Sequence, residues 1–70
     1  MENIIVTVSG PDKSGKGYVI AAISHALENF GVTVQVQGSE THNKAKLEKT
    51  DEEISTKLSE KVVYVIEQQT

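Results

Sequence analysis

The sequence contains no cysteine, no tryptophan and no arginine, and only one proline among its 70 residues. Without cysteine there are no disulfide bridges, thiolate metal ligands or cysteine nucleophiles. Arginine usually recognises phosphate groups through paired hydrogen bonds and neutralises charge during phosphoryl transfer. A self-contained phosphotransferase would therefore lack its usual side chain, and we expect binding without catalysis.

An excess of basic residues is also missing, since ten carboxylates face seven lysines and the net charge is −3. This balance argues against non-specific binding of nucleic acid, whose affinity comes mainly from neutralised phosphates. Lys44, Lys46 and Lys49 form a basic cluster, but Glu48 and the acidic run 51–53 dilute it. We interpret this cluster as a solvated face.

Long apolar runs are absent too, and none approaches the roughly 20 residues of a membrane helix. No basic and apolar leader opens the chain, so we expect a cytoplasmic protein without a membrane partner. Residues 1–70 form a single domain, and a chain of this size buries only ~60% of its unfolded surface. The small core makes a homo-oligomer the expected state.

Three apolar segments alternate with two helical patterns along the chain. Strands are predicted at residues 3–8, 32–37 and 62–66, and helices at 15–30 and roughly 50–61. The order β-α-β-α-β predicts an α/β fold with a small, mainly parallel three-stranded sheet. Strand orders 2-1-3 and 2-3-1 both fit. The segment 32–37 alternates apolar and polar residues and carries no proline or lysine, so it could pair with a second copy.

Local signals mark the ends of the two predicted helices. Gly31 occupies the position of a left-handed helix cap, and Thr50 with Glu53 forms a capping-box pattern. The apolar stripe of the first helix comprises Val19, Ala22, Ile23, Ala26, Leu27 and Phe30. His25, Glu28 and Asn29 fall opposite this stripe and should face water. Residues 38–43 read as a polar connection.

The loop between the first predicted strand and helix carries glycines at 10, 15 and 17 and a lysine at 16. Such a loop can approach a phosphate closely, and the helix amides and Lys16 offer positive charge. We expect phosphate binding by Gly10, Asp12, Lys13, Ser14, Gly15, Lys16, Gly17 and Tyr18. The two histidines, in different elements, do not suggest a metal site.

Residues 3–37 resemble the first β-α-β unit of P-loop nucleotide kinases, whose loops often read Gly-Pro-Asp-x-Ser-Gly-Lys. The resemblance implies a P-loop-like domain that holds a nucleotide. Tyr18 departs from this pattern, because related loops place a serine or threonine hydroxyl at that position to bind Mg²⁺. The resemblance therefore argues against magnesium binding. Glu67 follows five apolar residues and is similar to the acid that ends a Walker B strand, which makes it a candidate acidic partner.

Nearly the whole chain is similar to short tailed-phage proteins that share this P-loop-like start, which would place it in the host cytoplasm. The expected function is binding of a nucleotide or other phosphate ligand. An alternative is an interaction protein that inhibits a host enzyme or defence system, by protein binding or by sequestering a nucleotide signal. The stretches 10–15, 18–23 and 31–32 also resemble the opening of an ACT regulatory domain, which implies binding of a small ligand.

Overall fold

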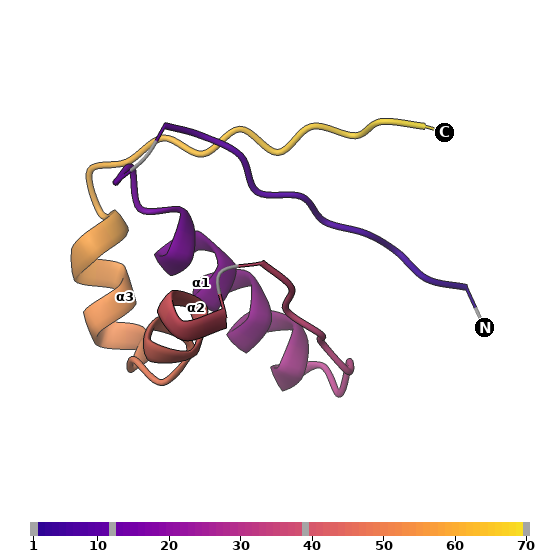
Figure 1. The fold of residues 1–70 in the computed structure, drawn as a ribbon, viewed down its shortest axis with the longest axis horizontal. Helices are drawn as coiled ribbons and strands as arrows, with labels where there is room; N and C mark the ends of the chain where they lie inside the picture. Colours follow the sequence, from indigo (N-terminus) through magenta and orange to yellow (C-terminus); the bar gives the residue numbers. More distant parts are fainter. Residues whose placement is uncertain (1, 12, 39, 70) are drawn as a thin grey trace.

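The computed structural model describes residues 2–11, 13–38 and 40–69, and these ranges contain three helices. They are α1 (Lys16–Asn29), α2 (Glu40–Leu47) and α3 (Asp51–Leu58). Both α2 and α3 pack against α1, while chain without helix leads into α1 and away from α3 towards the termini (Figure 1). No helix within these ranges is long and apolar enough to cross a membrane.

The predicted α/β fold is wrong for the part of the chain that the structure describes. No strand forms there at residues 3–8, 32–37 or 62–66. Neither of the two predicted strand orders is therefore present, and the described residues do not form a P-loop-like β-α-β-α-β domain. Apolar and β-branched residues favour extended backbone, but a strand also needs a second segment to satisfy its amide and carbonyl groups. These segments have the composition of strands, but they lack backbone hydrogen bonds to a neighbouring strand.

Helix α1 agrees with its predicted range and ends at Gly31, as predicted. Gly31 has a φ of 81°, in the left-handed region. Its amide donates to the Glu28 carbonyl at 3.0 Å, and the Val32 amide donates to the Leu27 carbonyl at 3.1 Å. This pair of bonds is a Schellman motif, which satisfies carbonyls that the helix end leaves open.

The core lies on an unexpected face of α1. Ala21 and Ser24 are its buried residues, and Ile54 is the buried residue of α3. At 100° per residue, Ala21 and Ser24 lie roughly opposite the predicted apolar stripe. That stripe is half-buried or exposed, and Phe30 at its end is 81% exposed. Helices α2 and α3 therefore cover the small-residue side of α1 and leave the apolar side without a layer of its own.

Helix α2 was not expected, because residues 38–43 read as a polar connection and the helix begins at Glu40. Its sequence contains only two apolar residues, Ala45 and Leu47, which is too few for a recognisable stripe. Helix α3 begins as predicted, since the Thr50 hydroxyl accepts a hydrogen bond from the Glu53 amide at 3.2 Å. That hydroxyl also donates to the Glu53 carboxylate at 3.3 Å, so the capping box takes a modified form.

Candidate functional site

The loop that precedes α1 is held together by the side chain of Lys16. Its Nζ donates hydrogen bonds to the carbonyl oxygens of Gly10 at 2.7 Å and Pro11 at 3.0 Å. Gly15 has a φ of 102°, which a glycine adopts without a steric penalty. An ammonium group has three donors, so Lys16 commits two of them to the loop and keeps one. The loop is thus braced from within by the lysine expected to contact phosphate.

The amino end of α1 offers partial positive charge beside this loop. Its N-cap, Gly15, supplies no side-chain hydrogen bond, and its first turn carries no acidic residue. The aligned peptide dipoles of a helix favour a negative charge at this end, where the first amides lack partners inside the helix. No acidic side chain of the helix's own first turn competes with an incoming anion.

Lys46 contacts Tyr18, in the first turn of α1, and Lys49 and Lys57 line a hollow with it. Lys46 of α2 places its Nζ 4.1 Å from the centre of the Tyr18 ring, within cation–π range. A hydrogen bond from Lys46 and the charges of Lys46, Lys57 and Lys49 lower the pKa of the Tyr18 phenol, against a smaller opposing effect of burial. We refer to Tyr18, Lys46, Lys49 and Lys57 as the Tyr18 cluster.

Gly17 allows α2 to reach Tyr18. A Cβ atom built on Gly17 would lie 2.9 Å from Cγ of Lys46 and 3.5 Å from its Cε. The first distance is shorter than carbon atoms tolerate, so the Lys46 stem occupies the space that any side chain at position 17 would need. Glycine at this position therefore allows Lys46 to pack closely against α1. The sequence suggested a role in the conformation of the loop.

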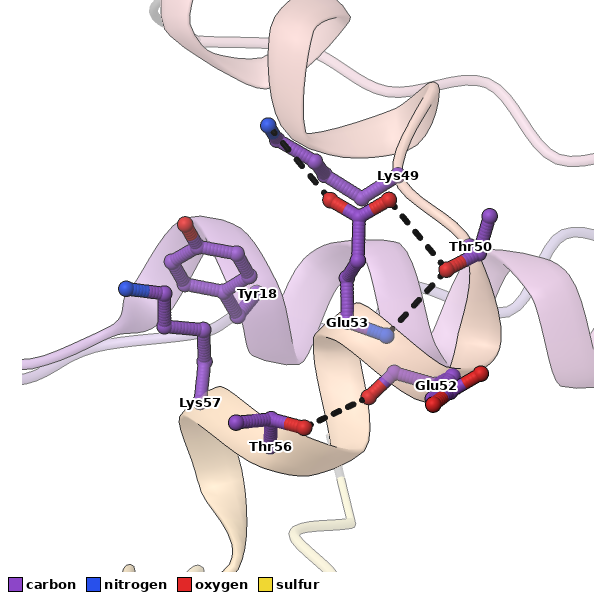
Figure 2. Close-up of a pocket in the computed structure, with 7 residues that line it drawn as sticks. All are labelled: Tyr18, Lys49, Thr50, Glu52, Glu53, Thr56 and Lys57. Carbon is purple, nitrogen blue, oxygen red and sulfur yellow. Dashed lines mark hydrogen bonds and ion pairs between the residues drawn. The ribbon is translucent and has the colours of Figure 1, made fainter.

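A surface hollow of about 350 Å³ lies between the start of α1 and α3 (Figure 2). Its lining residues are Tyr18, Lys49, Thr50, Glu52, Glu53, Thr56 and Lys57. In Figure 2, the Tyr18 ring and the Lys57 side chain lie together at one end, and Glu52 lies away from them. The hollow thus has a basic end formed by Tyr18 and Lys57.

The lysines of the Tyr18 cluster differ in how far their charges are compensated. Lys49 forms an ion pair with Glu53 at 3.6 Å. Lys46 and Lys57 have no carboxylate within 4.0 Å among the side chains that the structure describes. Since exposed charges of the same sign repel each other, their gathering around Tyr18 favours an anion at this point. Lys46 and Lys57 are the residues best placed to hold it.

The structure places most of the predicted phosphate-binding residues together, in the loop and the first turn of α1. These are Gly10, Lys13, Ser14, Gly15, Lys16, Gly17 and Tyr18, while Asp12 lies outside the described residues. Glu67 is exposed in the segment that follows α3, and no described hydrogen bond or ion pair brings it to the loop. Its proposed role as an acidic partner depended on a sheet that the described chain does not form.

Sequence reasoning missed the lysines of the Tyr18 cluster. The sequence predicts that Lys46 and Lys49 belong to a solvated face, but Lys46 contacts the Tyr18 ring. The spacing of Lys46, Lys49 and Lys57 carried no signal, because their convergence requires α2 and α3 to pack on α1. Within the described part of the chain, no three histidine, aspartate or glutamate side chains form a group that could hold a metal ion.

No protein-family model matches the chain, and comparisons with curated proteins and with solved structures find no similar protein. The resemblances to P-loop nucleotide kinases, tailed-phage proteins and ACT domains therefore rest on the residues quoted for them alone.

Proposed function

We propose that the protein binds a nucleotide or another phosphate-bearing ligand at the Tyr18 cluster and the adjoining amino end of α1. The observation that carries this proposal is the contact of Lys46 with the Tyr18 ring at 4.1 Å, beside a hollow that Lys49 and Lys57 line with Tyr18, in a chain whose net charge is −3. The cytoplasmic location expected from the sequence remains part of the proposal.

The chemistry of the cluster suits a phosphate group. Lys46 and Lys57 carry ammonium groups without a described carboxylate partner within 4.0 Å. A hydrogen bond between an ammonium and a phosphate oxygen contributes roughly 1.5–3 kcal/mol. The helix end adds a favourable dipole, and the hollow beside Tyr18 gives room for the rest of a ligand. Two such contacts contribute roughly 3–6 kcal/mol, which corresponds to a dissociation constant between several millimolar and tens of micromolar.

We further propose that the ligand is bound and not turned over. Phosphoryl transfer depends on positioning and on neutralisation of developing charge, and an arginine often contributes 10³–10⁵ in rate. The chain has no arginine, and Lys16 already donates two hydrogen bonds to the carbonyls of Gly10 and Pro11. The remaining lysines are point charges without the planar geometry of arginine.

The test is a titration of the full chain with pyrophosphate, ATP and GTP, followed by calorimetry and by amide chemical shifts. Lys46→Gln and Lys57→Gln should each weaken the best ligand about tenfold or more. Lys44→Gln is the matched control, because Lys44 lies on the same helix as Lys46 but lines a separate hollow with Val34 and Val36. It removes the same charge and should change affinity much less.

Two outcomes would contradict binding at this site: no saturable binding of any of the three probes at millimolar concentration, or equal losses for Lys44→Gln and Lys46→Gln. Release of phosphate from ATP and GTP with Mg²⁺ tests the second part of the proposal. Turnover near the roughly 1–100 s⁻¹ of kinases, abolished by Lys46→Gln, would show that the protein is an enzyme.

A further inference from the structure

The segments on either side of the helices expose an unusual amount of apolar side chain. Exposed fractions reach 92% for Ile4 and 93% for Val65. The large apolar residues exposed in these segments are Ile4, Ile5, Val6, Val62, Val63, Tyr64, Val65 and Ile66. Scattered exposed apolar residues are ordinary, but contiguous runs of this kind mark interaction surfaces.

The backbone of these segments lacks partners as well. Among the described residues, no backbone hydrogen bond joins residues 2–9 or 62–69 to another segment. Both segments extend from the helical part of the molecule (Figure 1). A row of open amide and carbonyl groups can pair with another strand, and neither apolar run contains the proline or lysine that blocks such pairing.

The solvent-accessible surface area of the chain is larger than expected for a folded monomer of its mass. The chain exposes 6509 Å², whereas a folded monomer of 7.6 kDa is expected to expose about 4,300 Å². The excess is therefore roughly 2,200 Å² per chain. A standard interface buries about 800 Å² on each partner, and obligate homodimers bury 2,000–5,000 Å² in total. The excess accessible area per chain thus matches what one partner buries in an obligate dimer interface.

The apolar side of α1 is only partly covered as well. Its stripe lies opposite the face that packs against α2 and α3, and Phe30 at its end is exposed. A helix with a partly covered apolar stripe and strand-like segments with unpaired backbones could supply the two layers of a helix-on-sheet packing. A second copy of the chain carries both layers and can complete both by symmetry.

We propose that a second copy of this chain pairs its segments 3–8 and 62–66 with those of the first, and that the resulting sheet covers the apolar stripe of α1 in both copies. Each apolar run of five or six residues has the length of an average strand. The segment 32–37, expected from the sequence to be the pairing edge, is less suited, because Val34 and Val36 are half-buried and line a hollow with α1 and α2.

Sedimentation equilibrium of the full chain tests this proposal with the variant Val65→Lys. Val65 is almost fully exposed, so the substitution should leave the helices intact and act on association. We expect a dimer at tens of micromolar and at least about a tenfold weaker association for Val65→Lys, from the loss of one buried apolar side chain. Gln68→Lys, which adds the same charge on the same segment beyond the apolar run, should dimerise like the wild type.

A second measurement keeps the proposal testable if Val65→Lys does not fold. In an equimolar mixture of isotope-labelled and unlabelled wild-type chains, intermolecular nuclear Overhauser contacts should join residues 3–8 or 62–66 of the two copies. A monomer at these concentrations overturns the proposal. This holds whether the two segments of one chain pair with each other, remain unpaired or bind a different protein. A dimer that Val65→Lys and Gln68→Lys affect equally also overturns it.

Discussion

His25 Nδ1 donates a hydrogen bond to Asp51 Oδ1 at 2.8 Å, while Nε2 of the same ring donates to the Leu47 carbonyl at 2.7 Å. Both partners are acceptors, so both hydrogen bonds form when the ring carries a proton on each nitrogen. The Asp51 hydrogen bond and then the Leu47 carbonyl raise the pKa of His25 above 6.5, with smaller contributions from the charges of Asp51 and Glu28, against desolvation. The imidazolium joins α1 to the end of α2 and the start of α3, so the prediction that His25 faces water is wrong.

This raised pKa predicts a pH dependence of stability. A group whose pKa is higher in the folded state adds stability that is complete below its unfolded value, here 6.5, and that is lost as the pH rises through the folded value. The free energy of unfolding should therefore decrease from about pH 6 upwards. Urea unfolding between pH 5 and 9 measures it.

The other histidine provides the control for this pH dependence. His25→Gln should flatten the decrease, whereas His42→Gln should retain it. A stability that increases with pH over this interval, or an equal effect of the two substitutions, would contradict the role of His25.

The contact between Lys46 and Tyr18 predicts a measurable change in ionisation. In a Tyr64→Phe background, ultraviolet titration reports Tyr18 alone, and its pKa should lie below the ordinary value of 10.0. Lys46→Gln should raise it towards that value, because the hydrogen bond from Lys46 is the largest cause of the shift. Gly17→Ala should act in the same direction, since the added Cβ displaces the Lys46 stem. An unchanged titration in both variants would show that Lys46 does not contact the ring.

The cap of α3 predicts a loss of stability on substitution. Thr50→Ala removes the oxygen that accepts from the Glu53 amide and should cost about 1 kcal/mol in the free energy of unfolding. Thr56→Ala is the matched control, because its hydroxyl donates to the Glu52 carbonyl within the helix, a bond that adds little. Equal losses for the two variants in urea unfolding would argue against the cap.

The end of α1 predicts a different response to two substitutions at one position. Gly31→Ala meets no atom within 4 Å but places a side chain at a φ of 81°, which should cost about 1–2 kcal/mol. Gly31→Asn should cost less, since asparagine tolerates the left-handed region better than alanine. Thermal unfolding of both variants checks this order, and the reverse order would contradict the Schellman geometry.

Features that depend on neighbouring residues could be predicted from the sequence. Helix α1, its stop at Gly31 and the cap of α3 by Thr50 are specified within a few residues of chain, and the structure confirms them. Helix α2 escaped prediction because its polar sequence has no apolar period, and its stability comes from packing on α1.

Features that depend on distant residues were predicted poorly. The apolar runs 3–8 and 62–66 have the composition of strands, but the pairing of strands is a long-range property that composition does not determine. The Tyr18 cluster escaped for the same reason, because Tyr18 and Lys57 meet only when α1 and α3 are packed. The loop residues expected to bind phosphate are close in sequence, and those that the structure describes accordingly lie together.

The small core described above has a consequence for the heat capacity of unfolding. Ala21 and Ile54 are the buried apolar residues of the described chain, so melting the helices of a single copy hydrates little new apolar surface. Its heat-capacity change should fall well below the roughly 0.9 kcal/mol/K typical of 70 residues. The monomer should consequently show a shallow, nearly temperature-independent stability curve, and a full-sized heat-capacity change should appear only where a sheet buries the apolar runs.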